Sequence, residues 1–317
     1  MGVVYGYRID SDLPLTRLRS GAPARGSLSV AVAHDDLLAE PAEIISLVLD
    51  PDADPVFAVA RREGALLTWC RVTGSARIDP AAGQIWVAPE GDPEAQEDRL
   101  LNTLIALLLA QRGELILHAA AVETERGAVI FCGPSGRGKS TLAAVLGTQG
   151  VPTLAEDVIV LTVQDGCVLA WPGPAGVRLH PATAQTLGGS GSTVVRGKHL
   201  HLPQALSSSA GVPVAAIVAL DPRGGSELEV TALDGPGGMA AIFLSVTRFE
   251  PDAWPGSFRQ TAGLIRRVPC HRARLPDDLG RVEQIAAELL GAVTSRGPRA
   301  RATEPVNGGV APASVVG

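Results

Sequence analysis

The feature that most constrains this chain is the run Val129–Thr141, which reads Val-Ile-Phe-Cys-Gly-Pro-Ser-Gly-Arg-Gly-Lys-Ser-Thr. It contains a complete phosphate-binding pattern, Gly-x-x-x-x-Gly-Lys-Ser, ending at Ser140. The apolar run Ala128–Phe131 predicts a buried strand before the loop, and Thr141–Leu146 predicts a helix after it. Such a pattern binds nucleotide phosphates when it lies between a strand and a helix, so the sequence predicts an α/β protein with a nucleotide site.

Each residue type in this loop has a physical task. Glycines let the backbone turn so that successive N–H groups point inward at phosphate oxygens, and the helix start adds its own N–H groups and positive dipole end. Lys139 is predicted to reach the β- and γ-phosphates, and the Ser140 hydroxyl is predicted to face Mg²⁺. The predicted nucleotide contacts are Gly133, Pro134, Ser135, Gly136, Arg137, Gly138, Lys139, Ser140 and Thr141.

Length and composition limit the class of protein. With 317 residues, 46% of them hydrophobic and 19% charged, the chain is long enough for one large domain or two ordinary ones. A net charge of −6 argues against nucleic acid or an anionic membrane as a partner. We expect a cytoplasmic protein with reduced thiols, because no signal peptide or membrane-spanning run is evident and the four cysteines form no CxxC pair.

The hydrophobic pattern changes along the chain and predicts four segments. The first part alternates apolar and polar residues between turns, which is typical of a small antiparallel sheet. Asp92 followed by Pro93 is a helix start, and the helix is expected to reach about Gln111. Its predicted apolar face consists of Leu101, Leu104, Ile105 and Leu108. The segments are a β-rich region at 1–90, a connecting helix at 91–112, a P-loop domain at 113–296 and a disordered tail at 297–317.

Short apolar runs and helical periodicity predict the elements of the P-loop domain. The predicted strands are 115–122, 128–131, 154–163, 177–179 and 214–220. The predicted helices are 140–149, which follows the loop, and 276–295, which closes the fold. Gly188–Gly197 is rich in glycine and serine and is predicted to be a mobile loop.

Two adjacent acids follow the loop helix, at Glu156 and Asp157 in the apolar run Leu154–Val160. Because strand side chains alternate in direction, both carboxylates are expected to face one site only near the end of the strand. One carboxylate would hold Mg²⁺ and the other would accept the proton of an attacking hydroxyl. The alternative is a solvated pair in a loop before a strand.

His118 lies in Leu115–Val122, an otherwise apolar predicted strand. A lone histidine in such a run is more often a core residue with its hydrogen bonds satisfied. If this strand pairs with the loop strand, however, His118 would lie beside the γ-phosphate. There an imidazole could orient an acid or move a proton.

Other charged residues offer alternatives for the metal and the phosphates. Asp221 ends the apolar run Val212–Asp221, as the metal-binding acid does in common ATPases, although Asp221-Pro222 is also a plain turn. Positively charged side chains near the transferring phosphoryl group would stabilise its negative charge in the transition state. Each candidate cation could equally be a surface charge. The candidates are Arg137, Arg178, Arg196 and Lys198.

Taken together, His118, the loop and Leu154–Val160 resemble the C-terminal domain of the HPr kinase/phosphorylase family, P-loop serine kinases related in fold to phosphoenolpyruvate carboxykinase. Within that superfamily the chain looks similar to kinases found with lasso-peptide biosynthesis genes. Those kinases phosphorylate the C-terminal serine of a precursor peptide. The supporting features are the opening Tyr5–Leu15, the β-rich front, the long helix before His118, and Trp171–Pro174 leading to Arg178-Leu179.

The resemblance implies a P-loop kinase domain of the HPr kinase type with a small β-rich N-terminal region, using ATP and Mg²⁺. It also implies a precursor peptide or a small carrier protein as partner, and raises a homo-oligomer as an expectation. The roles carried over are His118 as the active-site histidine, Lys139 as the loop lysine, Ser140 and Asp157 as metal ligands, and Glu156 as the base.

The chain departs from the family at two points. Its first acid is Glu156 where the family usually has Asp, and it lacks the downstream Glu-Ile-Arg-Gly-Leu-Gly-like signature of the bifunctional enzymes. From the loop, the acids and the resemblance together, the predicted function is an ATP-dependent serine kinase acting on a peptide. The alternatives are a carrier-protein kinase, a small-molecule kinase and a nucleotide-binding regulatory module without transfer activity.

Overall fold

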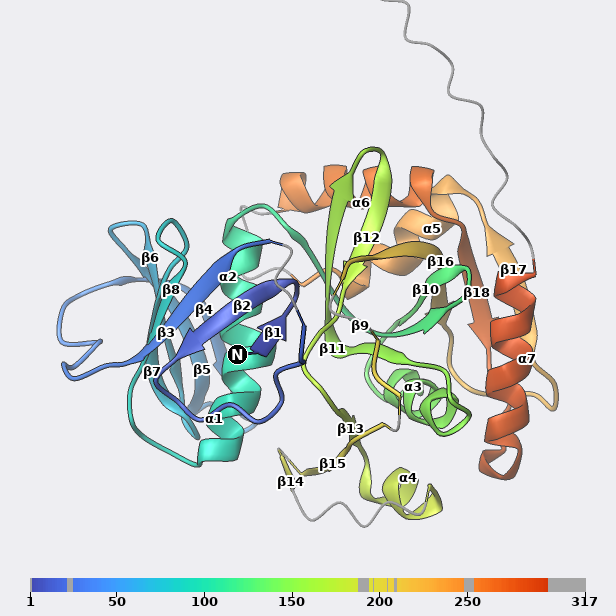
Figure 1. Ribbon diagram of the computed structural model, residues 1–317, viewed down its shortest axis with the longest axis horizontal. Helices are drawn as coiled ribbons and strands as arrows, with labels where there is room; N and C mark the ends of the chain where they lie inside the picture. The colour runs from blue at the N-terminus through green and yellow to red at the C-terminus, as the bar shows by residue number, and fades with distance from the viewer. Residues whose placement is uncertain are drawn as a thin grey trace, which may run out of the picture.

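The computed structural model describes residues 2–21, 25–187, 194–195, 197–203, 205–207, 210–247 and 254–295. Two large sheets lie side by side with one helix between them (Figure 1). Of the predicted loop Gly188–Gly197, only Val194, Val195 and Gly197 are described. Arg196 and the predicted tail at 297–317 lie outside the described residues.

The N-terminal sheet has eight strands in the order β1-β2-β3-β8-β7-β6-β5-β4. They are β1 Gly2–Val4, β2 Tyr7–Ser11, β3 Ser27–Val32, β4 Glu43–Leu49, β5 Pro55–Arg62, β6 Ala65–Cys70, β7 Gly74–Asp79 and β8 Gln84–Val87. The prediction of a small antiparallel sheet was wrong, since β3 runs parallel to both β2 and β8. Pairing between strands far apart in the sequence cannot be read from alternation alone.

The central sheet carries the phosphate-binding loop and has seven strands in the order β10-β9-β11-β12-β16-β18-β17. They are β9 Leu115–Thr124, β10 Gly127–Cys132, β11 Thr153–Gln164, β12 Cys167–Trp171, β16 Val212–Leu220, β17 Glu229–Leu233 and β18 Cys270–Arg274. Strand β10 also pairs with β16 in parallel, so five strands curl into a closed ring. The parallel strands β10, β16 and β18 therefore end at the same edge.

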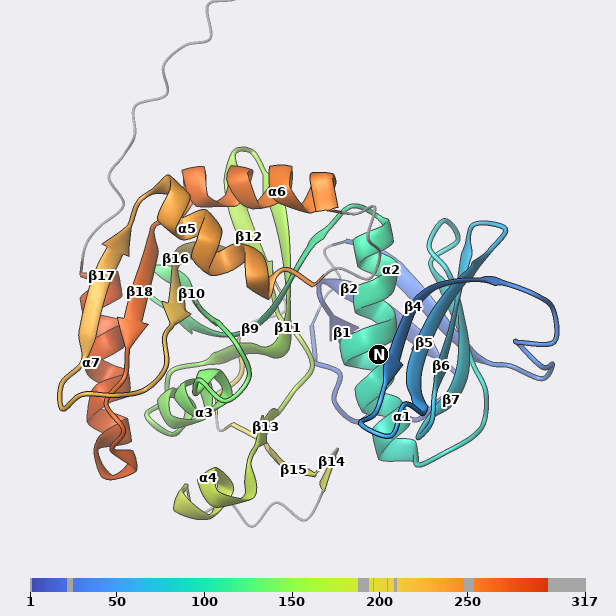
Figure 2. The ribbon, with the colours of Figure 1, turned by 180° about the vertical axis from the view of Figure 1, so that it is seen from behind.

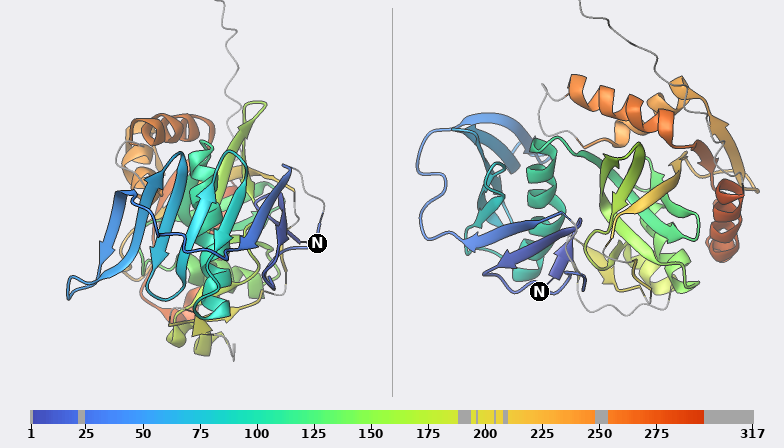
Figure 3. Two further views of the ribbon diagram at one scale, coloured as in Figure 1. Left: turned by 90° about the vertical axis from the view of Figure 1, so that its left-hand side faces the viewer. Right: turned by 45° about the horizontal axis from the view of Figure 1, so that its top comes forward.

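The helix between the sheets consists of α1 Pro93–Arg99, a π-helical turn η1 Leu100–Leu104 and α2 Ile105–Gln111 (Figure 3). Asp92 caps it by accepting a hydrogen bond from Ala95 N at 2.8 Å, as predicted. The prediction of one apolar face was wrong, because Leu100, Leu101 and every residue of Leu104–Leu109 are buried. Protein covers this helix on both sides, so it needs no polar face over these turns.

Helices cover both faces of the central sheet (Figure 2). On one face lie α3 Lys139–Thr148 and α7 Val282–Thr294, and on the other lie α5 Gly235–Ile242 and α6 Trp254–Arg267. The helix predicted at 276–295 begins later, at Val282, after a 3-10 turn η4 Leu279–Arg281. Helices α5 and α6 were not predicted from the sequence. Among the described helices, none combines the length and the apolar composition needed to cross a membrane.

A small third sheet lies beside the loop helix. Its strands are β13 Val177–Leu179, β14 Val194–Val195 and β15 Lys198–His201, with β15 in the middle. The remaining elements are α4 Pro181–Thr186 and the 3-10 turn η2 Phe243–Ser245. Strand β13 packs against β11 and α3, which brings Arg178 toward the predicted site.

Candidate active site

The phosphate-binding loop lies between β10 and α3, as predicted. Gly133 and Gly138 have φ values of 130° and 101°, in a region that L side chains rarely adopt. A Cβ atom on Gly133 would come within 2.9 Å of the Leu220 carbonyl oxygen, on the neighbouring strand β16. Only glycine therefore fits this close approach of two backbones. Lys139 is buried, and its Nζ donates hydrogen bonds to the carbonyl oxygens of Gly133 at 2.8 Å and Pro134 at 3.1 Å.

Glu156 and Asp157 lie within strand β11 and not at its end. The prediction that both acids can share a site only at a strand end was therefore wrong. Asp157 has a left-handed backbone with φ of 72°, and the register with β9 shifts between Thr153 and Ala155. This irregularity breaks the alternation of side chains. Both carboxylates reach Arg178, whose Nε lies 3.3 Å from Glu156 Oε2 and whose Nη2 lies 2.5 Å from Asp157 Oδ2.

Each acid has a different second partner. Ser140, in the first turn of α3, donates its hydroxyl hydrogen to Glu156 Oε1 at 2.8 Å. His118 Nδ1 lies 3.2 Å from Asp157 Oδ1 and 3.0 Å from the Asp157 carbonyl oxygen. Since both of these atoms are acceptors, the hydrogen of a neutral His118 ring is assigned to Nδ1. The structure thus brings His118, Ser140, Glu156 and Asp157 together.

Exposure separates the two carboxylates. The side chain of Glu156 is 5% exposed, whereas that of Asp157 is 25% exposed and that of His118 is 46% exposed. His118 is therefore not the core residue that an apolar strand would usually contain. Asp157 and His118 are therefore more accessible from the cleft than Glu156 is.

Electrostatics keep Asp157 ionised. Burial alone would raise the pKa of its carboxyl, but the hydrogen bond from His118 and the charge of Arg178 outweigh burial and hold the pKa below its ordinary value. Burial alone would lower the pKa of Arg178, but the negative charges of Glu156, Asp157 and Asp98 outweigh burial and raise the pKa above its ordinary value. The pKa of Lys139 is lowered, chiefly by burial, and Asp157 opposes that shift.

A cleft of about 440 Å³ joins the loop to the acids. It is lined by Ser135, Gly136, Gly138, Lys139, Ser140 and Thr141 of the loop, by His118, Glu156, Asp157 and Arg178, and by Leu179, His180, Thr183, Lys198, Arg223 and Asp277. Asp221, the alternative metal ligand, is not among the described residues that line this cleft. Its carboxylate faces Arg272, with Oδ1 3.8 Å from Nε.

Three residues at or near the site, Asp98, Arg17 and Arg223, were not predicted from the sequence. Asp98, on α1, is fully buried and binds Arg178 Nη1 at 2.7 Å. It also binds Arg17 of the N-terminal region, at 2.9 Å. Arg223 packs against the loop, since a Cβ atom on Gly138 would lie 2.8 Å from its Nη2. One signal was available for Asp98, because a charged residue next to a long apolar helical run needs a buried partner.

The donor set fits a magnesium–nucleotide complex. Mg²⁺ is usually held by one or two carboxylates together with substrate phosphates and water, and Ser140, Glu156 and Asp157 supply a hydroxyl and two carboxylates beside the glycine loop. The described residues contain no cluster of three His, Cys, Asp or Glu side chains that would make a separate metal site. Arg223 Nε is buried and has no hydrogen-bond partner within the described part of the chain, so it can donate to an anion on the loop.

Comparison with known proteins adds little to this geometry. No protein-family model matches the sequence, and no curated protein matches it. Among matching solved structures, the Hpr(Ser) kinase/phosphatase from Coxiella burnetii aligns with 56% of this chain and 95% of its own, at 11% sequence identity and a TM-score of 0.29. A superposition this loose carries no functional argument.

Proposed function

We propose that this protein is an ATP- and Mg²⁺-dependent kinase that phosphorylates a serine hydroxyl. The observation that carries the proposal is the convergence of Ser140, Glu156, Asp157 and His118 in one cleft with the phosphate-binding loop. A nucleotide-binding module without transfer activity does not need a hydrogen-bonded acid–histidine pair facing the phosphate site. An ionised acid beside such a loop is what phosphoryl transfer to a hydroxyl requires.

The contacts of the two acids support an exchange of the roles assigned from the sequence. Asp157 is the more exposed acid and is oriented by His118, which suits it to accept the acceptor's proton. Glu156 is buried and hydrogen-bonded to Ser140, which suits it to the metal side of the site. The sequence assignment had paired Ser140 with Asp157 at the metal and had made Glu156 the base.

The proposed reaction transfers the terminal phosphoryl group of ATP. A bound Mg²⁺ ion supplies positive charge to the phosphate oxygens. Asp157 removes the proton from the serine hydroxyl as the serine oxygen forms its bond to the γ-phosphorus, and the bond between that phosphorus and the ADP oxygen breaks. Lys139 and Arg223 stabilise the negative charge that shifts onto the phosphate oxygens during this step.

The substrate class rests on the resemblance alone. Within this proposal the acceptor is the C-terminal serine of a lasso precursor peptide, and an HPr-like carrier protein is the alternative acceptor. Within the same proposal, the peptide-binding surfaces are the β-rich N-terminal region and the predicted loop Gly188–Lys198. A cytoplasmic location and a homo-oligomer also stay predictions.

The test is mass spectrometry of the purified protein with ATP, Mg²⁺ and candidate acceptors. These acceptors are a precursor peptide encoded near its gene, where one exists, HPr-type carrier proteins and serine-terminated peptides. One phosphoryl group on a serine of one acceptor is the expected result. Lys139→Ala should lower the rate by at least about 100-fold while the protein stays folded, because one stabilising charge at the transferring group is lost. A folded Lys139→Ala variant with full activity would refute the proposal.

A further inference from the structure

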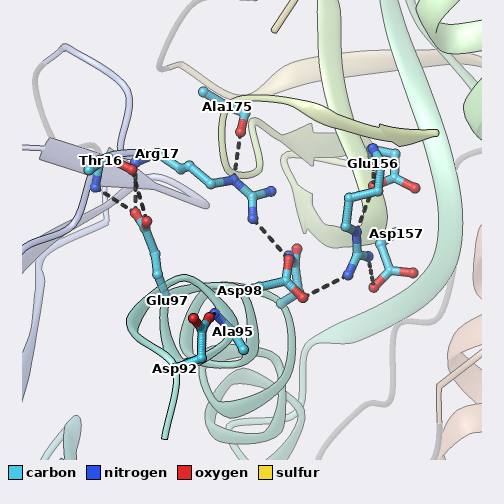
Figure 4. A network of polar contacts seen from close by, with 11 residues as sticks. Thr16, Arg17, Asp92, Ala95, Glu97, Asp98, Glu156, Asp157 and Ala175 are labelled. Atoms are coloured by element: carbon cyan, nitrogen blue, oxygen red, sulfur yellow. Dashed lines mark hydrogen bonds and ion pairs between the residues drawn. The ribbon is translucent and has the colours of Figure 1, made fainter. Parts of the chain in front are cut away.

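A chain of buried charges connects the N-terminal region to the two acids. Arg17 Nη1 lies 2.9 Å from Asp98 Oδ1, and Arg178 Nη1 lies 2.7 Å from Asp98 Oδ2. Arg178 then contacts Glu156 and Asp157 through its other two nitrogens. Figure 4 shows Asp98 lying between Arg17 and the acids. The charges alternate in sign from the N-terminal region to the active site.

Burial makes this arrangement rigid. The side chain of Asp98 is fully buried, and those of Arg17 and Arg178 are 7% and 5% exposed. An ion inside a protein must keep its partner, because an unpaired buried charge costs several kcal/mol. Arg178 therefore cannot swing away from Asp98 toward water. Its planar guanidinium presents its donors in fixed directions, so an anchor at Nη1 also fixes Nε and Nη2.

The same contacts hold the strand that carries Arg178. Arg17 Nε donates to the carbonyl oxygen of Ala175 at 2.9 Å, just before β13 begins. The Arg178 amide in turn donates to Glu156 Oε2 at 3.4 Å. The backbone of β13 and the side chain of Glu156 are thus fixed against each other. Both depend on residues that are distant in sequence from the phosphate-binding loop.

We propose that Asp98, supported by Arg17, is a positioning residue that holds Arg178 and thereby sets the orientation of Glu156 and Asp157. The N-terminal region and the connecting helix are then part of the active-site scaffold as well as a surface for a substrate. The consequence for Mg²⁺ rests on the proposed function. The positioning itself does not, because it concerns contacts within the chain.

The test variant is Asp98→Asn in the full-length protein. An asparagine can still accept hydrogen bonds from Arg17 and Asn102 with its oxygen, as Asp98 Oδ1 does now. Its amide nitrogen would then face the Arg178 guanidinium, so two donors would oppose each other. The variant therefore breaks the contact to Arg178 and keeps most of the helix packing.

Glu97→Gln is the matched control. Glu97 is the neighbouring residue on α1, and its carboxylate accepts hydrogen bonds from Thr16 N at 2.6 Å, Thr16 Oγ1 at 2.8 Å and Arg17 N at 2.8 Å. It holds the same N-terminal segment but makes no hydrogen bond to Arg178 that the structure describes. A loss of general docking would affect both variants, whereas a loss of positioning would affect Asp98→Asn alone.

The first readout needs no nucleotide. Amide hydrogen exchange at Arg178 and along residues 155–158 should become faster in Asp98→Asn, because the bond from the Arg178 amide to Glu156 loses its support. The rate should not change in Glu97→Gln. Unchanged exchange in Asp98→Asn, or equal acceleration in both variants, would overturn the positioning proposal.

The second readout is equilibrium binding of a fluorescent ATP analogue with and without Mg²⁺. Asp98→Asn should raise the Mg²⁺ concentration for half-maximal binding by about 10- to 100-fold, as expected when a group orienting metal ligands is lost, and metal-free binding should not change. If the exchange effect appears but the wild-type protein binds no nucleotide, positioning stands and the kinase proposal fails. If nucleotide binds and its Mg²⁺ dependence is the same in Asp98→Asn as in wild type, the positioning proposal fails instead.

If Asp98→Asn does not fold, Arg178→Lys provides the same test. Lysine keeps the positive charge, but its ammonium group cannot bridge three carboxylates in the fixed directions of a guanidinium. The same faster exchange along 155–158 and the same increase in Mg²⁺ requirement are expected. Wild-type values for both measurements in this variant would overturn the proposal.

Discussion

At the scale of single residues, the site depends on how one backbone irregularity presents two acids. The left-handed backbone at Asp157 lets it and Glu156 bind one guanidinium, which regular alternation along a strand would prevent. Each acid also has a second partner of its own. Glu156 accepts a hydrogen bond from Ser140, whereas Asp157 pairs with His118, and this difference supports different proposed roles for the two acids. The chemistry assigned to each acid therefore follows from its neighbours and not from its position in the sequence.

Replacement of His118 should change the pH dependence of the reaction. Burial raises the pKa of Asp157. The hydrogen bond from His118 and the charge of Arg178 outweigh burial, so the net shift of the pKa is downward. His118→Phe removes one lowering contribution, so the acidic limb of the kcat/KM profile should move to higher pH. The rate at neutral pH should fall by about 10- to 100-fold. His118→Gln, which can keep a donor to Asp157, should show a smaller shift.

The same pKa shift predicts the sign of the stability change. Because the folded-state pKa of Asp157 is below its unfolded value, its contribution to stability is present at neutral pH and is lost as pH falls. The stability difference between wild type and His118→Phe should therefore shrink on acidification. Thermal unfolding across a pH series measures this difference.

For the kinetic prediction, an acidic limb of the kcat/KM profile that does not move in His118→Phe would contradict the assigned role of the Asp157–His118 pair.

At the scale of elements, the helix between the sheets is the part whose environment differs most from the sequence-based expectation. Its leucines were assigned to one face, but the helix lies between two layers and is buried all round over Leu104–Leu109. The charged residues Glu97 and Asp98 lie in α1, before the π-helical turn Leu100–Leu104. The element therefore joins an apolar core to the polar network of the site.

Leu107 tests this description, because it lies off the face predicted from the sequence and yet is fully buried. Leu107→Ala should lower the free energy of unfolding by about 2–5 kcal/mol, as is usual for a buried leucine. Leu104→Ala, on the predicted face, should cost a similar amount. Urea denaturation of both variants gives the comparison. A cost below about 0.5 kcal/mol for Leu107→Ala would be typical of a surface position and would contradict burial on both sides.

At the scale of the whole molecule, the two large sheets share contacts that tie them into one structure. Val158, Val160 and Trp171 of the central sheet belong to the same apolar core as the N-terminal sheet. Arg19 adds hydrogen bonds to the carbonyl oxygens of Gly173 at 2.6 Å and Leu154 at 2.8 Å. The β-rich region is thus not a separately packed unit in this structure.

We expect the two sheets to unfold together, because the N-terminal sheet shares its apolar core with Val158, Val160 and Trp171 of the central sheet. In a urea series followed by pulsed hydrogen exchange, peptides from β5–β7 and from β9–β11 should lose protection at the same midpoint. Arg19→Leu should lower both midpoints by the same amount, since it weakens the contact between the sheets. Loss of protection in β5–β7 at a clearly lower urea concentration would contradict this expectation.

The sequence by itself determined the local features whose physical cause is local. The glycine pattern and the strand before it defined the phosphate-binding loop, and Asp92-Pro93 defined the helix start. Chemistry also selected His118, Lys139, Ser140, Glu156 and Asp157, which line one cleft in the structure and whose roles stay predictions. These signals need only neighbouring residues, so they can be read without the fold.

Only the tertiary structure decided which distant residues complete the site. Arg178 is one of several cations that could equally be surface charges, and although the position of Asp98 calls for a buried partner, nothing in the sequence indicates that Arg17 and Arg178 are its partners. The parallel pairing of β3, and the position of Glu156 and Asp157 but not Asp221 among the described residues that line the cleft, also depended on which strands lie next to each other. Long-range pairing reflects the burial and charge balance of the whole chain, which a local sequence pattern does not contain.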